Sequence, residues 1–244
     1  MMKEVGAKGR HQNNTGAGMT LAAWLDRFAV VILAALILVV LPILLDTFRL
    51  GLAAKYLCFA FPAVGIVLVW GYGGILSLGQ GAFFGLGSYM MAMFLKLESA
   101  ADAGSSSGTA LAAFFGTAGL PDFMAWNSVE ELPWWWEPFH HIWFTIPAII
   151  LIPAFVAFVL GYANFRRRVS GVYFAIVTLA VSAILAIVII GQQGLTGGIN
   201  GITDFKTFLG MDLDTDGAKL IMYYITAVLL IVILLAARFV LKSR

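Results

Sequence analysis

Two polar side chains, Ser77 and Gln80, lie within a glycine-rich part of a long apolar run. Residues 71–87 read GYGGILSLGQGAFFGLG and contain seven glycines, inside 40 uncharged residues at Tyr56–Leu95. Such a run is long enough for two membrane crossings, and its glycines favour a helix break between them. Irregular backbone at membrane depth is tolerated only where protein or a water-filled cavity covers it, and buried polar groups are costly without a use. We predict that Ser77 and Gln80 line a solute pathway.

The same stretch has a second interpretation as a surface for helix packing. Gly81 and Gly85 form a G-x-x-x-G pair, and Ser88 continues the small-residue face. Small residues at this spacing let two membrane helices approach closely. We therefore predict that Gly81, Gly85 and Ser88 serve helix packing.

Two further segments offer neutral polar groups. Phe174, Thr178 and Ser182 recur at every fourth residue and so share one face of a helix. This stripe would suit a neutral polar solute, or it would make hydrogen bonds between helices. Residues 191–204, GQQGLTGGINGITD, carry the amide of Asn200 and form either another part of the pathway or an external turn.

No residue pattern in the chain points to covalent chemistry. The three histidines have no metal-site spacing, and no glycine-rich phosphate loop of the ATPase type occurs. The single cysteine, Cys58, sits in an apolar stretch and is expected to be a small buried hydrophobe. A formal net charge of only +2 gives no support for a nucleic-acid partner. The prediction is a protein that is not an enzyme, with no catalytic, cofactor-binding or metal-binding residues.

The composition places the chain in a membrane. Hydrophobic residues make up 61% of it and charged residues only 11%, whereas soluble domains carry about 25% charged residues. Uncharged runs of membrane-spanning length predict an all-α, polytopic bundle of about six transmembrane helices with glycine-rich breaks. The expected helices cover about 28–46, 53–71, 80–96, 142–164, 171–190 and 220–241.

Lysine and arginine predict the orientation of these helices. Ten of the fifteen basic residues fall in 1–27, 165–170 and 238–244, and basic residues favour the cytoplasmic side. We expect a cytoplasmic N-terminal tail at 1–27 and a multi-pass transmembrane domain at 28–241. Residues 97–141 are expected to form an external loop, with Arg49 and Lys55 in another.

At these residues the sequence resembles a known family. Trp70–Phe84 (WGYGGILSLGQGAFF) and Gly171–Leu179 (GVYFAIVTL) are similar to the permease subunits of branched-chain amino acid and urea ABC importers. Lys55–Ala60 (KYLCFA), Glu131–Trp136 (ELPWWW) and Asn200–Lys206 (NGITDFK) look more like the urea branch. The resemblance runs through nearly the whole chain after residue 20.

The resemblance implies that residues 28–241 belong to the permease domain of a heteromeric importer in a bacterial inner (plasma) membrane, which works by alternating access. A second homologous permease, two cytoplasmic ATPases that use the ATP, and a periplasmic substrate-binding protein are the implied partners, together with membrane lipid. Family members continue beyond Leu241–Arg244 (LKSR), so the chain resembles an N-terminal portion of a longer protein.

The expected function is transport of urea or short amides. The alternatives are a branched-chain amino acid permease, a passive urea channel and a membrane scaffold without transport activity. A scaffold has no reason to concentrate glycine and polar residues at 71–87 and 191–204.

Overall fold

The computed structural model describes residues 28–104, 120–129, 131–166 and 171–242. Phe28–Leu44 is an apolar helix that contains a π-helical turn, η1 (Leu36–Val40), and ends in α2 (Leu41–Leu44). The remaining elements are α3 (Thr47–Gly73), α4 (Gln80–Gly104), α6 (Asp122–Trp126), η2 (Glu137–His140), α7 (Ile142–Arg166), α8 (Val172–Gly191), α9 (Gln193–Thr196), η3 (Gly198–Asn200), β1 (Thr207–Phe208), β2 (Met211–Asp212) and α10 (Asp216–Lys242).

Four helices of the described residues are long and apolar enough to cross a membrane: α3, α7, α8 and α10. The six predicted spans are thus confirmed for four. Phe28–Leu44 is apolar but has only 17 residues, so it is shorter than these four helices. The helix α4 has the length but is less apolar, because it carries glycines, Gln80 and the charged residues Lys96 and Glu98. The predicted N-terminal tail at 1–27 lies outside the described residues.

Three helix boundaries differ from those predicted. The helix α3 begins at Thr47 and not at residue 53, so Arg49 lies in a helix and the prediction that it occupies a loop is wrong, whereas Lys55 falls within the predicted helix 53–71. The helix α4 runs on to Gly104, which makes the first residues of the predicted external loop helical. The helix α10 begins at Asp216, where the hydroxyl of Thr215 accepts the N–H of Ala218 at 3.3 Å and caps its first turn. A two-residue antiparallel ladder, β1 with β2, is the one departure from helix among the described elements.

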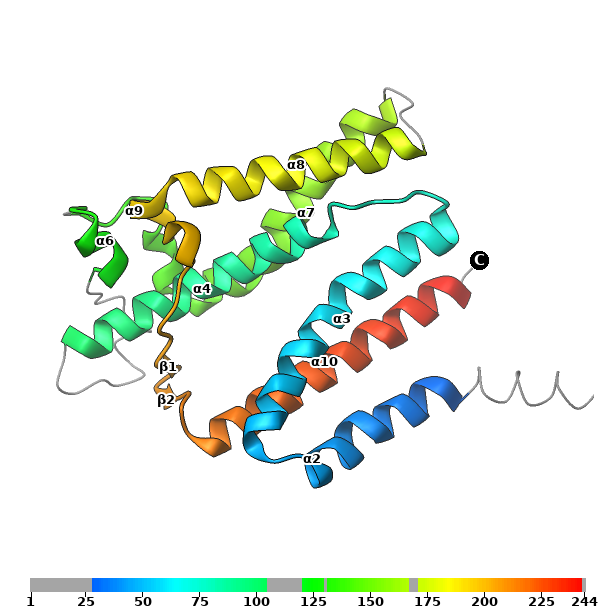
Figure 1. Ribbon diagram of the computed structural model, residues 1–244, viewed down its shortest axis with the longest axis horizontal. Coiled ribbons are helices and arrows are strands. Elements are labelled where there is room, and N and C mark those ends of the chain that lie inside the picture. The colour runs from blue at the N-terminus through cyan, green and yellow to red at the C-terminus, as the bar shows by residue number, and fades with distance from the viewer. Residues whose placement is uncertain (1–27, 105–119, 130, 167–170, 243–244) are drawn as a thin grey trace, which may run out of the picture.

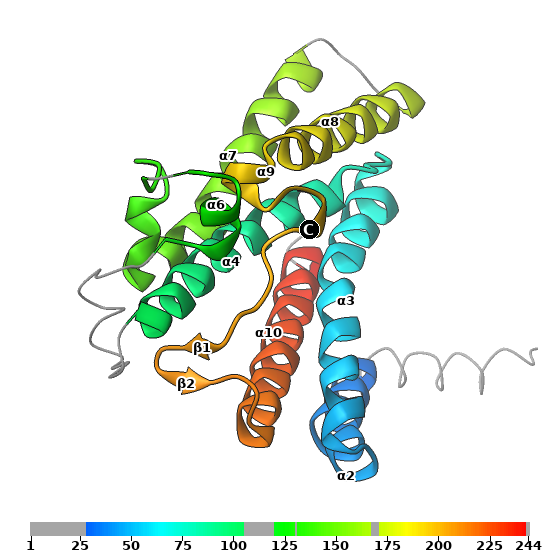
Figure 2. The same ribbon diagram turned by 60° about the vertical axis from the view of Figure 1, so that its left-hand side comes forward.

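The helices form two groups (Figure 1 and Figure 2). In one group α3 and α10 lie side by side, and Phe28–Leu44 packs against them. In the other, α4 packs along α7, and α8 lies beside α4. The residues of α6 and η2 cover the far end of α4 and α7 in an apolar cluster that includes the fully buried Met93, Met124 and Trp136.

Gly87 allows the close contact between α4 and α7. A β-carbon at this position would lie 3.1 Å from the carbonyl oxygen of Ile149 in α7. That carbonyl has no donor in its own helix, because the residue four positions later is Pro153. The glycine of α4 therefore covers a backbone oxygen that α7 itself leaves without a partner.

Tyr223 of α10 performs a similar task for the first helix. Inside the π-turn the N–H of Leu41 bonds to the oxygen of Leu36, five residues back. The next donor in that register would be residue 42, which is Pro42 and has no N–H. The carbonyl of Ile37 instead accepts the hydroxyl of Tyr223 at 2.5 Å, and both residues are buried.

Replacing Gly87 by alanine should destabilise the pairing of α4 with α7 by about 1 kcal/mol, because the added methyl crowds the carbonyl of Ile149. Gly85→Ala is the matched control: nothing lies within 4 Å of its would-be β-carbon, so the gain in helix propensity should leave stability unchanged or raised by up to about 1 kcal/mol. Reversible unfolding in mixed micelles measures both. Equal stability of the two variants would contradict the close-contact role of Gly87.

Tyr223→Phe should lower the free energy of unfolding by about 1–2 kcal/mol, because it leaves the buried carbonyl of Ile37 without a donor. The control is Tyr224→Phe on the neighbouring residue, which is 37% exposed and makes no recorded hydrogen bond to the described part of the chain. The same unfolding assay should show the loss in the first variant alone. A loss of equal size in both would mean that the hydroxyl of Tyr223 is not the cause.

Candidate functional site

The predicted helix break lies between α3 and α4 and is confirmed. The helix α3 ends at Gly74, whose φ of +65° is left-handed and whose N–H donates to the oxygen of Trp70 at 3.1 Å. Residues 74–79 then run as irregular chain against α8 before α4 begins at Gln80 (Figure 1). We call residues 74–79 the connecting segment.

Thr178 of α8 satisfies the backbone of the connecting segment. The N–H of Leu78 donates to the hydroxyl oxygen of Thr178 at 3.2 Å, and that hydroxyl donates to the carbonyl of Ala175 at 3.0 Å. Thr178 lies six residues after the start of α8, about 9 Å along its axis. The segment therefore meets α8 within the apolar length of the helix rather than at its end.

Gly79 makes the contact possible. A β-carbon there would lie 3.0 Å from both the β-carbon and the carbonyl oxygen of Thr178, and 3.4 Å from the hydroxyl of Ser182. Ser182 in turn donates to the carbonyl of Thr178 at 2.9 Å. Ser77, only 5% exposed, belongs to the same segment. The structure thus brings the predicted Thr178 and Ser182 together with the backbone of Leu78 and Gly79, and we call these four residues the Thr178 cluster.

Gln80 and Phe174 face other helices. The side-chain oxygen of Gln80 lies against α3, 3.3 Å from where a β-carbon of Gly65 would be. The ring of Phe174 stacks on that of Phe165 in α7, with centroids 5.8 Å apart, and is 9% exposed. The side chain of Gln80 therefore packs on α3, and that of Phe174 packs on α7.

A groove with a volume of about 300 Å³ separates α4 from α8. Gly81 and Gly85 line its α4 side, with no atom within 4 Å of their would-be β-carbons, and Ser182 and Ala186 line its α8 side. The hydroxyl of Ser88 bonds to the carbonyl of Phe84 in its own helix. The packing role of Gly81, Gly85 and Ser88 stays a prediction. The glycines in closest contact with other helices, Gly79 and Gly87, were not predicted, since only tertiary approach distinguishes them from their neighbours.

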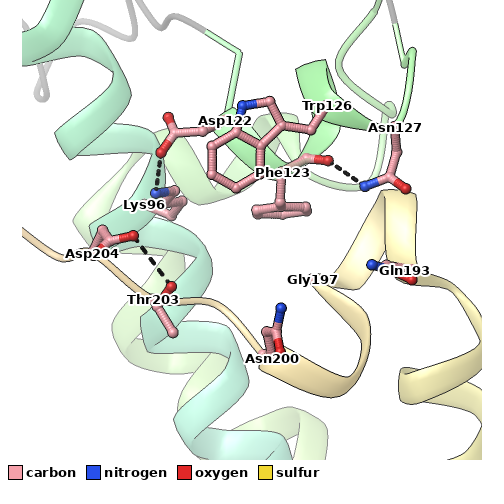
Figure 3. A pocket seen from close by; sticks show the side chains of 11 residues that line it. Lys96, Asp122, Phe123, Trp126, Asn127, Gln193, Gly197, Asn200, Thr203 and Asp204 are labelled. Carbon is pink, nitrogen blue, oxygen red and sulfur yellow. Dashed lines mark hydrogen bonds and ion pairs between the residues drawn. The ribbon is translucent and has the colours of Figure 1, made fainter.

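Asn200 lies in a different place, a pocket of about 80 Å³ at the far end of α8 (Figure 3). Thr178 is 13 residues, about 20 Å, from the last residue of α8, so Asn200 does not join the Thr178 cluster. Figure 3 shows the side chains of Gln193 and Asn200 on one side of the pocket and the ring of Phe123 on the other. The amides of Gln193 and Asn200 form no recorded hydrogen bond within the described part of the chain.

The end of α4 supports this pocket through residues that sequence analysis missed. The buried ammonium of Lys96 pairs with Asp122 at 2.9 Å and holds the pKa of that carboxyl below its usual range. Ser99 accepts the N–H of Lys206 at 3.0 Å, and Glu98 accepts that of Gly210 at 2.8 Å. Glu98 and Ser99 fell in the expected external loop at 97–141, whereas the structure places them on α4. Among the described residues no group of histidine, cysteine or acidic side chains could hold a metal ion.

Comparison with known proteins gives the family. Residues 48–244 match the family described as the branched-chain amino acid transport system / permease component. The high-affinity branched-chain amino acid transport system permease protein LivM of Salmonella typhimurium is 24% identical over 214 residues, covering 79% of this chain and 40% of the relative. LivM of Escherichia coli matches with the same identity and coverage, and no solved structure matches the chain.

The chain therefore spans about 40% of the length of the curated relatives it matches. The matched family consists of permease components, which agrees with the prediction of a multi-pass membrane subunit that is not an enzyme. The urea branch suggested by several sequence segments is not distinguished by these matches. The chain belongs to the branched-chain amino acid transport system permease family.

Proposed function

We propose that this chain forms part of the translocation pathway of an ABC importer for a small polar solute. The observation that carries the proposal is the contact of the connecting segment with Thr178, inside the apolar length of α8. Irregular backbone within the apolar length of a membrane bundle is tolerated where protein buries it or where it lines a water-filled cavity. The groove beside this contact, with the hydroxyl of Ser182 on its wall, provides the space that a solute needs.

The proposed mechanism is alternating access, with this chain as one of two related permeases. ATP is bound and hydrolysed by cytoplasmic partner subunits, and a periplasmic binding protein delivers the solute. The connecting segment suits such a mechanism because it joins the two packed helix groups through six residues that lie outside any helix. A shift of the α3 and α10 group against the α4, α7 and α8 group would first strain the hydrogen bond from the N–H of Leu78 to the hydroxyl of Thr178.

Two solutes are candidates, each favoured by a different observation. The names of the relatives favour a branched-chain amino acid. The neutral character of the groove favours urea or a short amide, since none of its lining residues is charged. A zwitterionic amino acid needs donors for its carboxylate and acceptors for its amine, whereas an amide is served by hydroxyl and backbone groups.

Uptake by the assembled transporter tests the function. Vesicles with the partner permease, ATPases and binding protein should take up labelled leucine or labelled urea only when ATP is present. Thr178→Val should reduce this uptake by about fivefold or more, because the N–H of Leu78 loses its acceptor at a cost of about 1–3 kcal/mol.

The matched control is Thr226→Val in α10, whose hydroxyl bonds only to Met222 of its own helix. It should leave uptake near the unmodified level, and Thr178→Ser should restore most of what Thr178→Val loses. Equal uptake with and without ATP would indicate a passive channel instead. Unchanged uptake in Thr178→Val would remove the connecting segment from the pathway.

The proposed orientation puts the N-terminus and residues 165–170 in the cytoplasm and residues 97–141 outside. It rests on the distribution of basic residues. Single cysteines at Ser107 and Arg167, in a Cys58→Ala background, should react differently with a membrane-impermeant thiol reagent on intact cells. We expect labelling at position 107 and none at 167 until the cells are opened, and the reverse pattern would invert the topology.

A further inference from the structure

Lys55 occupies a position that transport does not explain. It lies eight residues, about 12 Å, past the first residue of α3, and it is the one charged residue between Leu50 and Gly73. A lysine within a membrane-spanning helix is costly unless its ammonium group reaches water or an anion. Yet within the described residues Lys55 forms no ion pair or recorded hydrogen bond.

A groove with a volume of about 380 Å³ runs beside Lys55, between the first turns of α3 and α10. One face of α3 supplies Thr47, Phe48, Gly51, Leu52 and Lys55, and α10 supplies Asp216 and Lys219. We call it the α3–α10 groove. Its apolar wall is open to the surroundings, since Phe48 is 79% exposed and Leu52 is 40% exposed. A β-carbon at Gly51 would meet nothing within 4 Å, so no protein atom fills the floor of the groove there.

The charges of the groove favour an anion. Its two lysines outnumber its one aspartate, and no ion pair links them within the described part of the chain. Side chains on a helix lean toward its N-terminus, so Lys55 extends back toward the first turn of α3. Lys219 of α10 lines the groove beside that turn. Lys219 donates one N–H to the carbonyl of Asp214 at 2.8 Å, which holds its ammonium group at the start of α10 and leaves two donors.

We propose that the α3–α10 groove binds an anionic phospholipid. The phosphodiester lies between the ammonium groups of Lys55 and Lys219, with the hydroxyl of Thr47 as a further donor. One acyl chain follows the apolar wall of Phe48 and Leu52. Basic pockets between membrane helices bind anionic lipid head groups in this manner. The α3–α10 groove lies on the helix pair away from α4 and α8, so this inference does not depend on which solute is carried.

Lipid titration of the purified 244-residue chain in detergent tests the proposal, with bound lipid counted by native mass spectrometry. Phosphatidylglycerol should bind, and Lys55→Gln or Lys219→Gln should each weaken it about fivefold. The double variant should lose about 25-fold if the two lysines act independently. Lys55→Arg should retain binding, because the guanidinium keeps the charge and donates to phosphate.

The control is Lys206→Gln, which removes an exposed lysine outside the groove and should leave the affinity unchanged. Phosphatidylcholine should bind at least fivefold more weakly than phosphatidylglycerol, since its head group adds a positive charge. Equal binding of the two lipids would overturn the proposal, as would unchanged affinity in both lysine variants. Inorganic phosphate that displaces the lipid completely at equal concentration would also overturn it, because the apolar wall would then contribute nothing.

Discussion

The backbone N–H of Leu78 needs an acceptor inside an apolar bundle, and the hydroxyl of Thr178 supplies it at 3.2 Å. Lipid offers no hydrogen bonds, so a helix can be interrupted at membrane depth only where another element satisfies the freed groups. The requirement fixes several other features. The close contact with α8 requires glycine at position 79. Gly74, in the left-handed conformation, ends α3 so that the connecting segment can run along α8 and lead into α4.

The same constraint acts at two of the prolines within the helices, Pro42 and Pro153. Pro42 removes the donor that the π-turn would offer to Ile37, and the hydroxyl of Tyr223 replaces it. Pro153 removes the donor for Ile149, and Gly87 of α4 closes over that carbonyl. In both cases a polar backbone group exposed by one helix becomes the point where a second helix packs. At Pro42 and Pro153 the irregular turn of one helix is therefore also its contact with a second helix. A substitution at either proline is expected to affect both the turn and the contact.

Much of this arrangement follows from local sequence. Four spans are predicted by uncharged runs, and the glycines at 71–74 predict where α3 ends. The boundaries that differ lie at charged residues. The predicted helix 53–71 starts after Arg49 and the predicted helix 80–96 stops at Lys96, whereas α3 begins at Thr47 and α4 continues to Gly104. The ion pair of Lys96 with Asp122 lets the backbone stay helical past a charge. The spacing of Thr178 and Ser182 indicates a shared face, but the bond from Thr178 to a residue 100 positions away depends on tertiary approach that no local pattern encodes.

The described helices form two tightly packed pairs and one looser contact. The pairs α3 with α10 and α4 with α7 are tightly packed around buried carbonyls, so their internal arrangement is costly to alter. Between α4 and α8 the contact is looser: a groove remains, and the adjoining connecting segment is held to α8 through a single described hydrogen bond. A two-state change needs an interface that is cheap to break beside units that stay intact. In the proposed mechanism the interface of α8 with the connecting segment is the one that opens. It contains Thr178 and Ser182, for which the sequence leaves both a pathway role and a packing role open.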